Sequence, residues 1–279
     1  MHRRKVVAAM VDVLLATYRP NDVWLKEQID SIRAQRGVDI NLIMRDDPKG
    51  EGACANFNAL LKMSDGDYAA FSDQDDVWQE EKLAKMMSRM LEVEAERGRD
   101  VPILVFCDSV ITDETLHPMS ETLISRSGVN VRRGLRFERL LMQNFISGHA
   151  MLINAALRRK VGDIPQDAIM HDYWVALVAA AFGVISFLDD PLVMYRQHSS
   201  QALGAMGKCH STAGFRSRLA HNILQAKAFC RRYGAECPEC VRALSRIDAM
   251  TWWGKRLEIV RHGLFKSGLR RNLGVFVLI

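Results

Sequence analysis

The feature that most constrains the fold is a regular alternation of short apolar runs and amphipathic stretches over the first hundred residues. Three runs have the length and composition of buried strands, at residues 11–17, 40–44 and 67–71. Three stretches carry apolar side chains at helical spacing, at residues 23–35, 53–63 and 80–97. Strands that alternate with helices favour a parallel sheet with helices on both faces. We therefore predict an α/β fold with a Rossmann-like, mostly parallel sheet flanked by helices.

The chain changes character near residue 205. Strand-like runs continue to about residue 195, and the later segments 215–233, 238–253 and 255–265 have the patterns of helices. With 279 residues and 48% hydrophobic composition, the chain is long and apolar enough for one large domain with an appendage. We predict an α/β domain over residues 1–205 and a C-terminal helical extension over residues 206–279.

The start of the chain and its cysteines bear on the compartment. Basic residues 2–5 precede an apolar run, but Asp12 interrupts that run, which continues into the first predicted strand. We expect a short basic leader rather than a secretion signal, and a cytoplasmic protein with reduced thiols. Cys237 and Cys240 have metal-ligand spacing, with Cys230 and His210 nearby, so a zinc site is an alternative to free thiols.

An acidic cluster follows the third predicted strand. Asp73, Asp75 and Asp76 fall within four residues, and such charges repel unless they face water or a cation sits among them. Mg²⁺ and Mn²⁺ prefer oxygen ligands, so the cluster indicates either a metal–diphosphate site or a polar turn into the next helix. No glycine-rich phosphate loop follows any predicted strand, so a phosphate-bearing substrate would need a cation to neutralise it.

Polar residues also follow the first two predicted strands, as Thr17-Tyr18 and Asp46-Asp47. In open α/β sheets, ligands bind beyond the carboxyl ends of the strands, so the three clusters are expected at one rim. Further along the chain, Asp172 opens a helix, where an Asp is often an N-terminal cap. His198 follows the last predicted strand and is either structural or a ligand.

Taken together, these segments resemble the family 2 glycosyltransferases with the GT-A fold, over about residues 10–205. The similarity is carried by residues 13–18, 27–32, 45–47, 66–78, 147–154, 171–174 and 195–198. It is strongest to the bacterial rhamnosyltransferase-like branch that builds cell-surface polysaccharides. The resemblance implies a metal-dependent inverting transferase that moves a sugar from a dTDP- or UDP-linked donor to a hydroxyl of a growing glycan, either a polysaccharide or a lipid-linked oligosaccharide.

The resemblance also implies roles for individual residues. The donor would be held by Thr17, Tyr18, Asp46 and Asp73, the divalent Mg²⁺ or Mn²⁺ by Asp75 and His198, and the acceptor proton would be taken by Asp172. Three more residues would contact the acceptor or support the site from behind: His171, Trp174 and Gly148. Asp76 is expected to cap or brace the following helix.

Two departures from the family pattern leave alternatives open. Pro48-Lys49 stands where the family has Gly-Ser, and Arg19-Pro20 where it has Asn-Gly, which puts the local nucleotide contact in doubt. A non-catalytic sugar-nucleotide-binding member is therefore one alternative. A nucleotidyl or phosphoryl transferase on a similar sheet is another, although that class should carry a glycine loop or a basic triphosphate clamp.

The C-terminal tail mixes basic residues with Trp252, Trp253 and several aliphatic residues. Such a segment suits peripheral contact with the inner face of the cytoplasmic membrane, or a helix packed on the domain with its charges in water. A nucleic-acid partner is not expected, because no recognition motif accompanies the basic residues.

Overall fold

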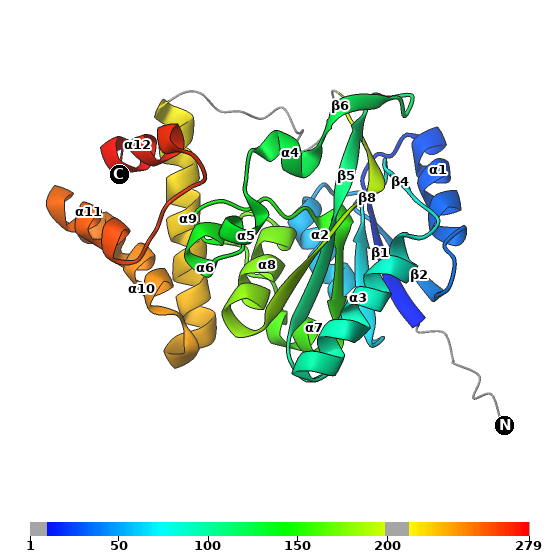
Figure 1. Cartoon of the computed structure of the whole chain (residues 1–279), viewed down its shortest axis with the longest axis horizontal. Coiled ribbons are helices and arrows are strands. Elements are labelled where there is room, and N and C mark those ends of the chain that lie inside the picture. Colours follow the sequence, from blue (N-terminus) through cyan, green and yellow to red (C-terminus); the bar gives the residue numbers. More distant parts are fainter. Residues whose placement is uncertain (1–9, 199–211, 279) are drawn as a thin grey trace.

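The structure is a computed structural model that describes residues 10–198 and 212–278 (Figure 1). These residues form an eight-stranded sheet in the order β2-β1-β3-β7-β5-β8-β4, with β6 paired to β5. The strands are β1 (Met10–Thr17), β2 (Asp39–Asp46), β3 (Tyr68–Ser72), β4 (Val77–Trp78), β5 (Ile103–Thr112), β6 (Pro118–Thr122), β7 (Met151–Asn154) and β8 (Val184–Arg196).

Helices cover the sheet and form the far end of the molecule. Those before residue 198 are α1 (Asp22–Arg33), α2 (Ala53–Met63), α3 (Lys82–Arg97), α4 (Leu123–Ser127), α5 (Val131–Gly134), α6 (Phe137–Leu140), the 3₁₀ helix η1 (Gly148–Ala150), α7 (Ala155–Val161) and α8 (His171–Phe182). Those after residue 212 are α9 (Thr212–Tyr233), η2 (Gly234–Glu236), α10 (Glu239–Arg246), η3 (Ile247–Ala249), α11 (Trp252–Arg261) and α12 (Leu269–Leu278).

The α/β architecture is confirmed, and the sheet is mixed. β1 pairs in parallel with β2 and β3, and β5 pairs in parallel with β8. β7 lies between β3 and β5 and is antiparallel to both. The sheet is therefore less parallel than the alternation of strands and helices predicts. β7 follows the short helices α4, α5, α6 and η1 instead of one long crossover helix, and β4 and β6 also pair antiparallel, with β8 and β5.

The two faces of the sheet bury separate sets of side chains, because successive residues of a strand point to opposite faces. On β1, Leu14 joins a core with residues of α2 and α8, whereas Val13 and Leu15 join a core with residues of α1 and α3. This sandwich fixes the carboxyl ends of β1 and β3 at one rim of the sheet.

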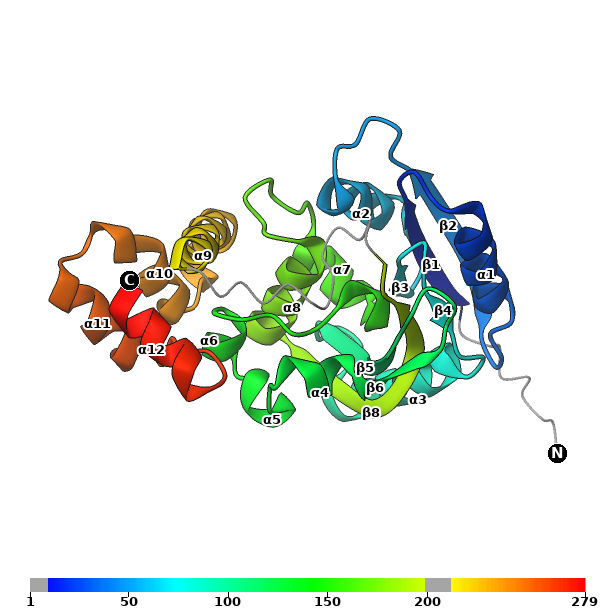
Figure 2. The same cartoon turned by 90° about the horizontal axis from the view of Figure 1, so that it is seen from above.

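The helices after residue 212 share the core on the α8 side. Phe229 of α9, Leu244 of α10 and Ile259 of α11 are buried in the same cluster as the side chains of α8. Figure 2 shows these helices beside α8 and α6, at the end of the molecule away from β1 and β2. The helical extension is thus packed continuously onto the α/β part. The predicted boundary near residue 205 and the predicted basic leader lie outside the described residues.

Two sequence expectations concern features outside the sheet. Within the described residues, no helix has both the length and the apolarity needed to cross a membrane. Cys230 and Cys237 place their sulfur atoms 3.1 Å apart, and both are free thiols with Cys240. Cys230, Cys237 and Cys240 do not form a metal-ligating group among the described residues. Cys209 and His210 lie outside those residues.

Candidate active site

A cleft of about 720 Å³ opens at the carboxyl ends of β1 and β3. Its walls come from the β1–α1 turn, the loop before α2, the β3–β4 turn, η1, the start of α8 and the residues after β8. It brings together eight of the ten residues expected at the site, namely Thr17, Tyr18, Asp73, Asp75, Gly148, His171, Asp172 and His198.

Asp46 lies beside the cleft rather than in its wall. It is exposed at the end of the edge strand β2, where its Oδ1 accepts a hydrogen bond from Thr17 Oγ1 at 3.0 Å. The neighbouring Asp47 lines the cleft instead and accepts hydrogen bonds from the N–H groups of Glu51 and Gly52, at 3.0 and 2.9 Å. Asp47 therefore orders the loop that contains Pro48 and Lys49.

The β1–α1 turn is held by a side chain from the acidic segment. The Gln74 amide accepts from the N–H of Tyr18 at 2.7 Å and donates to its carbonyl at 3.1 Å. The next residue, Arg19, has a φ of 44°, in the left-handed region that favours Gly and Asn. The backbone at residue 19 thus takes a conformation that suits the Asn of the family pattern, whereas Pro20, with its fixed negative φ, does not reproduce the Gly.

Asp75 and His198 meet at the mouth of the cleft. Asp75 Oδ2 lies 2.7 Å from His198 Nε2, so residues 123 positions apart are brought into direct contact. Burial and the nearby Asp73 carboxylate raise the pKa of Asp75. A raised pKa indicates that this corner of the cleft favours additional positive charge.

Arg196 is a buried residue that fixes the same corner. Its Nε donates to the carbonyl of Asp75 at 2.8 Å, and its guanidinium contacts Glu27 Oε2 of α1 at 2.5 Å. Its backbone N–H donates to Asp76 Oδ1 at 3.2 Å. Asp76 does not cap the following helix, whose N-cap residue is Glu81, because the Asp76 side chain is fully buried and bonded to the end of β8. That it braces this helix stays a prediction.

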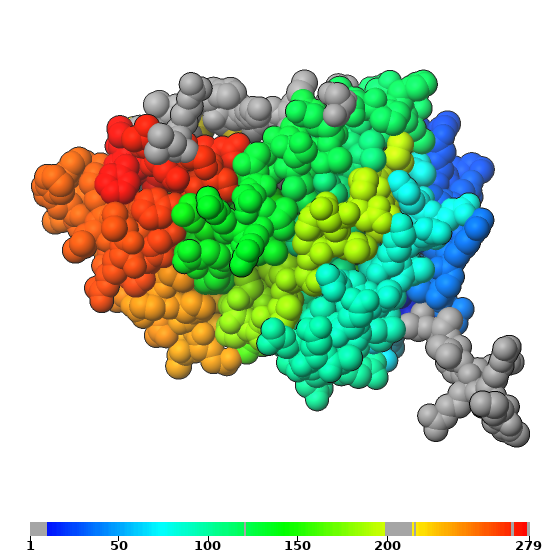
Figure 3. Space-filling view, viewed as in Figure 1, coloured from blue at the N-terminus to red at the C-terminus, as the bar shows by residue number. Residues whose placement is uncertain are grey.

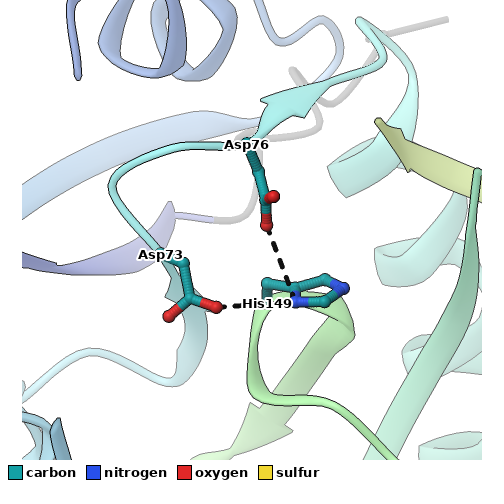
Figure 4. A group of neighbouring side chains, drawn as sticks. All are labelled: Asp73, Asp76 and His149. Atoms are coloured by element: carbon teal, nitrogen blue, oxygen red, sulfur yellow. Dashed lines mark ion pairs between the residues drawn. The ribbon is translucent and has the colours of Figure 1, made fainter. Parts of the chain in front are cut away.

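Asp73, Asp76 and His149 gather their ligand atoms at one point, as Figure 4 shows. His149 Nδ1 lies 3.5 Å from Asp73 Oδ2 and 3.6 Å from Asp76 Oδ2. Asp76 Oδ2 is buried and has no hydrogen-bond partner among the described residues. Sequence reasoning missed His149, because a single histidine beside Gly148 gives no periodic or spacing signal.

The chemistry of these donors fits a hard divalent cation. Carboxylate oxygens with one imidazole nitrogen suit Mn²⁺ or Mg²⁺, and the partnerless oxygen of Asp76 shows that the region is rich in acceptors. Two sets of residues could contribute, namely Asp75 with His198, as the resemblance implies, and Asp73 with Asp76 and His149.

Asp172 forms the opposite wall of the cleft, in the first turn of α8. Its Oδ2 accepts from the N–H of Gly148 at 3.2 Å and its Oδ1 from the N–H of Tyr173 at 2.5 Å. Met170, not Asp172, is the N-cap residue of α8. Burial raises the pKa of Asp172 to about 7, which is suited to a group that gains and loses a proton near neutrality.

His171 stands beside Asp172 and is held rigidly. Its ring stacks on Phe57 at 3.9 Å, and burial lowers its pKa to about 4, so the imidazole is neutral at pH 7. Neither ring nitrogen has a hydrogen-bond partner among the described residues. A Cβ on Gly148 would come within 2.6 Å of His171 Nε2, so glycine at this position leaves room for the ring.

Trp174 does not belong to the cleft. Its indole is fully buried and packs on Phe229 and Tyr233 of α9, with ring centroids 5.4 and 6.3 Å away. Full burial outside the cleft leaves Trp174 no surface for contact with the acceptor, and the other expected role, support of the site from behind, stays a prediction.

Comparisons with known proteins agree with this geometry. Residues 25–161 match the model of glycosyl transferase family 2. The dTDP-rhamnosyl transferase RfbG of Shigella flexneri is 24% identical over 226 residues, which cover 68% of this chain and 74% of that protein. An uncharacterized protein of Mycobacterium tuberculosis is 26% identical over 149 residues, and the match spans only 40% of its length.

Solved structures show the same fold. The mannosyltransferase PcManGT of Pyrobaculum calidifontis, in complex with GDP-Man and Mn²⁺, aligns over 95% of this chain and 77% of its own, with a TM-score of 0.53 and 14% identity. TarS 1–349 of S. aureus, in complex with UDP-GlcNAc, aligns over 92% of this chain and 93% of its own, with a TM-score of 0.50 and 13% identity.

The fold is therefore that of the GT-A glycosyltransferases, with a mixed sheet and flanking helices. More closely, residues 25–161 match glycosyl transferase family 2, and the similarity to RfbG makes the chain rhamnosyltransferase-like.

Proposed function

We propose that this protein is a metal-dependent inverting glycosyltransferase that moves a sugar from a nucleoside-diphosphate donor to a hydroxyl of a cell-surface glycan. The observation that carries the proposal is the position of Asp172, across one cleft from Asp73 and Asp75. A single carboxylate opposite a cation-binding corner is what one-step displacement at an anomeric carbon requires.

The donor end of the cleft is built for a nucleoside diphosphate. Thr17 and Tyr18 offer polar and aromatic contacts for the base and ribose, and Asp73 points into the cleft with its side chain 41% exposed. Asp75 and His198 would hold a divalent cation, which supplies positive charge to a diphosphate leaving group. RfbG, named as a dTDP-rhamnosyl transferase, makes a dTDP-linked donor our first candidate, with a UDP-linked donor as the second.

The acceptor end supplies the proton acceptor. A sugar hydroxyl is a weak nucleophile, so the ionised Asp172 carboxylate takes its proton as the oxygen attacks the anomeric carbon opposite the leaving group. The N–H of Gly148 fixes the carboxylate orientation. His171 lines the cleft with a neutral ring, but both of its ring nitrogens are buried, so it supports Asp172 from behind instead of bonding the acceptor.

These features favour an enzyme over the two alternatives. The Pro48–Lys49 loop, which supported a non-catalytic member, is ordered by Asp47 and leaves the cleft open. A nucleotidyl or phosphoryl transferase should carry a glycine-rich phosphate loop or a basic triphosphate clamp, and the sequence has no glycine-rich phosphate loop after any strand.

We also propose that the acceptor is presented at the inner face of the cytoplasmic membrane. Six of the fourteen exposed large hydrophobic side chains among the described residues lie on α11 and α12, namely Trp252, Trp253, Leu257, Val260, Leu273 and Val277. Residues 252–278 carry six Lys or Arg residues and one Glu. Apolar side chains among basic ones complement an anionic lipid bilayer, and Figure 3 shows these helices, in orange and red, at one end of the molecular surface.

A thermal-shift panel tests the enzymatic proposal. dTDP-rhamnose, UDP-N-acetylglucosamine and GDP-mannose are each added with Mn²⁺ or with EDTA, and the matching donor should raise the melting temperature by about 5 °C. The Asp75→Ala variant should keep its fold and lose the Mn²⁺-dependent part of the shift. The proposal fails if no nucleotide-sugar shifts the melting temperature under either condition.

A further inference from the structure

His149 occupies a position that the roles described so far leave unexplained. It sits in η1 directly behind the acidic turn, and only 2% of its surface is exposed. Its Nδ1 faces Asp73 on the cleft side and Asp76 on the buried side, at 3.5 and 3.6 Å (Figure 4).

The imidazole is fixed from three directions. Its Nε2 lies 2.9 Å from Ser109 Oγ of β5, and its ring stacks on Tyr195 of β8 with centroids 4.8 Å apart and planes 20° apart. Its backbone carbonyl accepts from the buried Lys82 ammonium of α3 at 2.6 Å. A side chain held by β5, β8 and α3 has little freedom to turn away from the two carboxylates.

The tautomer follows from these contacts. Nδ1 faces two carboxylates, which only accept, so we assign the ring hydrogen to Nδ1, between Asp73 and Asp76, and Nε2 is left to accept from the Ser109 hydroxyl. Without that N–H, the partnerless Oδ2 of Asp76 would face the Asp73 carboxylate directly, and the two like charges would repel. Asp73 would then lose the contact that sets its direction.

We propose that His149 is a positioning residue that holds the Asp73 carboxylate toward the donor and separates it from the buried Asp76. This inference rests on the proposed function, because it gives Asp73 a donor to contact. His149 itself lines the cleft behind Asp73, so its effect on the donor acts through that carboxylate.

The test separates positioning from a general role in folding. His149→Gln should destabilise the protein, because the Gln amide takes the place of Nε2 and leaves no N–H at the position of Nδ1, between Asp76 Oδ2 and Asp73. Adding Asp76→Asn in the same chain removes that buried charge and should restore the melting temperature. The double variant should still bind the matching nucleoside diphosphate, chosen from dTDP, UDP and GDP, about tenfold more weakly than Asp76→Asn alone. His117→Gln, at an exposed histidine, is the matched control and should bind like the wild type.

Calorimetric titrations with Mn²⁺ and with EDTA give the decisive comparison. Positioning by His149 predicts a similar loss of affinity under both conditions. A loss confined to Mn²⁺ would show instead that His149 is a metal ligand and would overturn the inference. Equal affinities for the double variant and Asp76→Asn would overturn it too. If the wild type binds none of the three nucleotides, the proposed function is rejected together with the role of His149. If the wild type binds a nucleotide and the variants bind it equally well, only the role of His149 is rejected.

Discussion

At the residue scale, the proposed roles of the acids separate by environment. Asp73 and Asp75 stand at the corner proposed to bind a cation, whereas Asp172 is flanked by backbone N–H groups and the neutral His171. A raised pKa at Asp172 and an acceptor-rich corner opposite give one proton acceptor and one site for positive charge. The division of labour therefore follows from which side chains surround each carboxylate.

The Asp172→Asn variant should lose turnover by about a thousandfold, because the amide is unable to take the acceptor proton. Its Oδ1 can still accept one of the two N–H groups that bond Asp172, so the fold and the donor affinity should persist. Release of nucleoside diphosphate measures turnover, circular dichroism measures folding, and calorimetric donor titration measures donor affinity. Asp167→Asn, at an exposed carboxylate, is the control. Turnover near the wild-type rate would remove Asp172 from the role of base.

The activity should depend on pH through the same carboxylate. Burial raises the pKa of Asp172 to about 7, so the proportion of ionised base increases as the pH rises through that value. kcat/KM should therefore rise about tenfold per pH unit on the acid side and level off above about pH 7. The residual activity of Asp172→Asn should lack this step. A wild-type profile that stays flat from about pH 5.5 to about pH 8 would contradict the assignment.

Sequence patterns located most of the site residues but not their arrangement. Thr17, Asp73 and Asp75 follow strands, so parallel pairing of β1 and β3 was enough to predict that they meet. Trp174 and His149 were misjudged or missed, because their positions depend on the packing of α8 against α9 and of η1 against β5 and β8. Those contacts join distant segments and leave no local signal.

At the scale of elements, η1 connects the two halves of the site. Gly148 donates its N–H to Asp172 and leaves space for His171, and the next residue, His149, faces Asp73 and Asp76. A three-residue helix therefore sets the geometry of both the base and the acidic turn. Its position follows from β7, which it precedes directly and which is anchored between β3 and β5.

A Gly148→Ala substitution should disturb the acceptor side of the cleft. The added Cβ would lie 2.6 Å from His171 Nε2, and the ring has Phe57 stacked against it, so η1 or His171 must shift. We expect kcat to fall by about tenfold to a hundredfold, because small displacements of a general base are costly. Donor affinity should change by less than about threefold, since the Thr17 end is untouched.

The control for this substitution is Gly254→Ala, within α11, where the new Cβ would meet Thr251 Oγ1 at 3.2 Å. Steady-state kinetics and donor titration of both variants, beside their melting temperatures, make the comparison. A Gly148→Ala enzyme with wild-type kcat would show that the cleft tolerates the displaced ring.

The helices and strands also show which features the periodicity of apolar residues predicts. The bounds of α2 agree with the predicted 53–63, because its apolar residues repeat at helical spacing up to Ser64. Periodicity is the same in parallel and antiparallel strands, so the direction of β7 was not encoded in it. The predicted helix 238–253 is instead α10, η3 and the first residues of α11, whose N-cap Thr251 accepts from Gly254 N–H at 3.2 Å.

At the scale of the whole molecule, the chain has a cleft in the α/β part and an apolar, basic surface on α11 and α12. Trp253, Leu257 and Val260 lie at i, i+4 and i+7, so they form one exposed stripe, with exposed fractions of 75, 65 and 55%. Because α9 and α10 pack into the α8 core, a contact made by α11 would fix the orientation of the cleft relative to the membrane.

A triple variant replaces the stripe by serine, as Trp253→Ser, Leu257→Ser and Val260→Ser in one chain. Its binding to vesicles that contain anionic phospholipid should be weaker by about tenfold or more, because burial of apolar surface in the bilayer contributes about 25 cal/mol per Å². The basic residues of the extension should make wild-type binding fall as salt rises. The matched control replaces three exposed apolar side chains elsewhere, Val23, Met63 and Leu91, with serine and should bind like the wild type. Co-sedimentation with anionic and with neutral vesicles measures the difference. Equal binding of the two triple variants, or no binding by the wild type, would contradict a membrane-facing extension. A selective loss with normal donor affinity would support contact between the extension and the lipid surface.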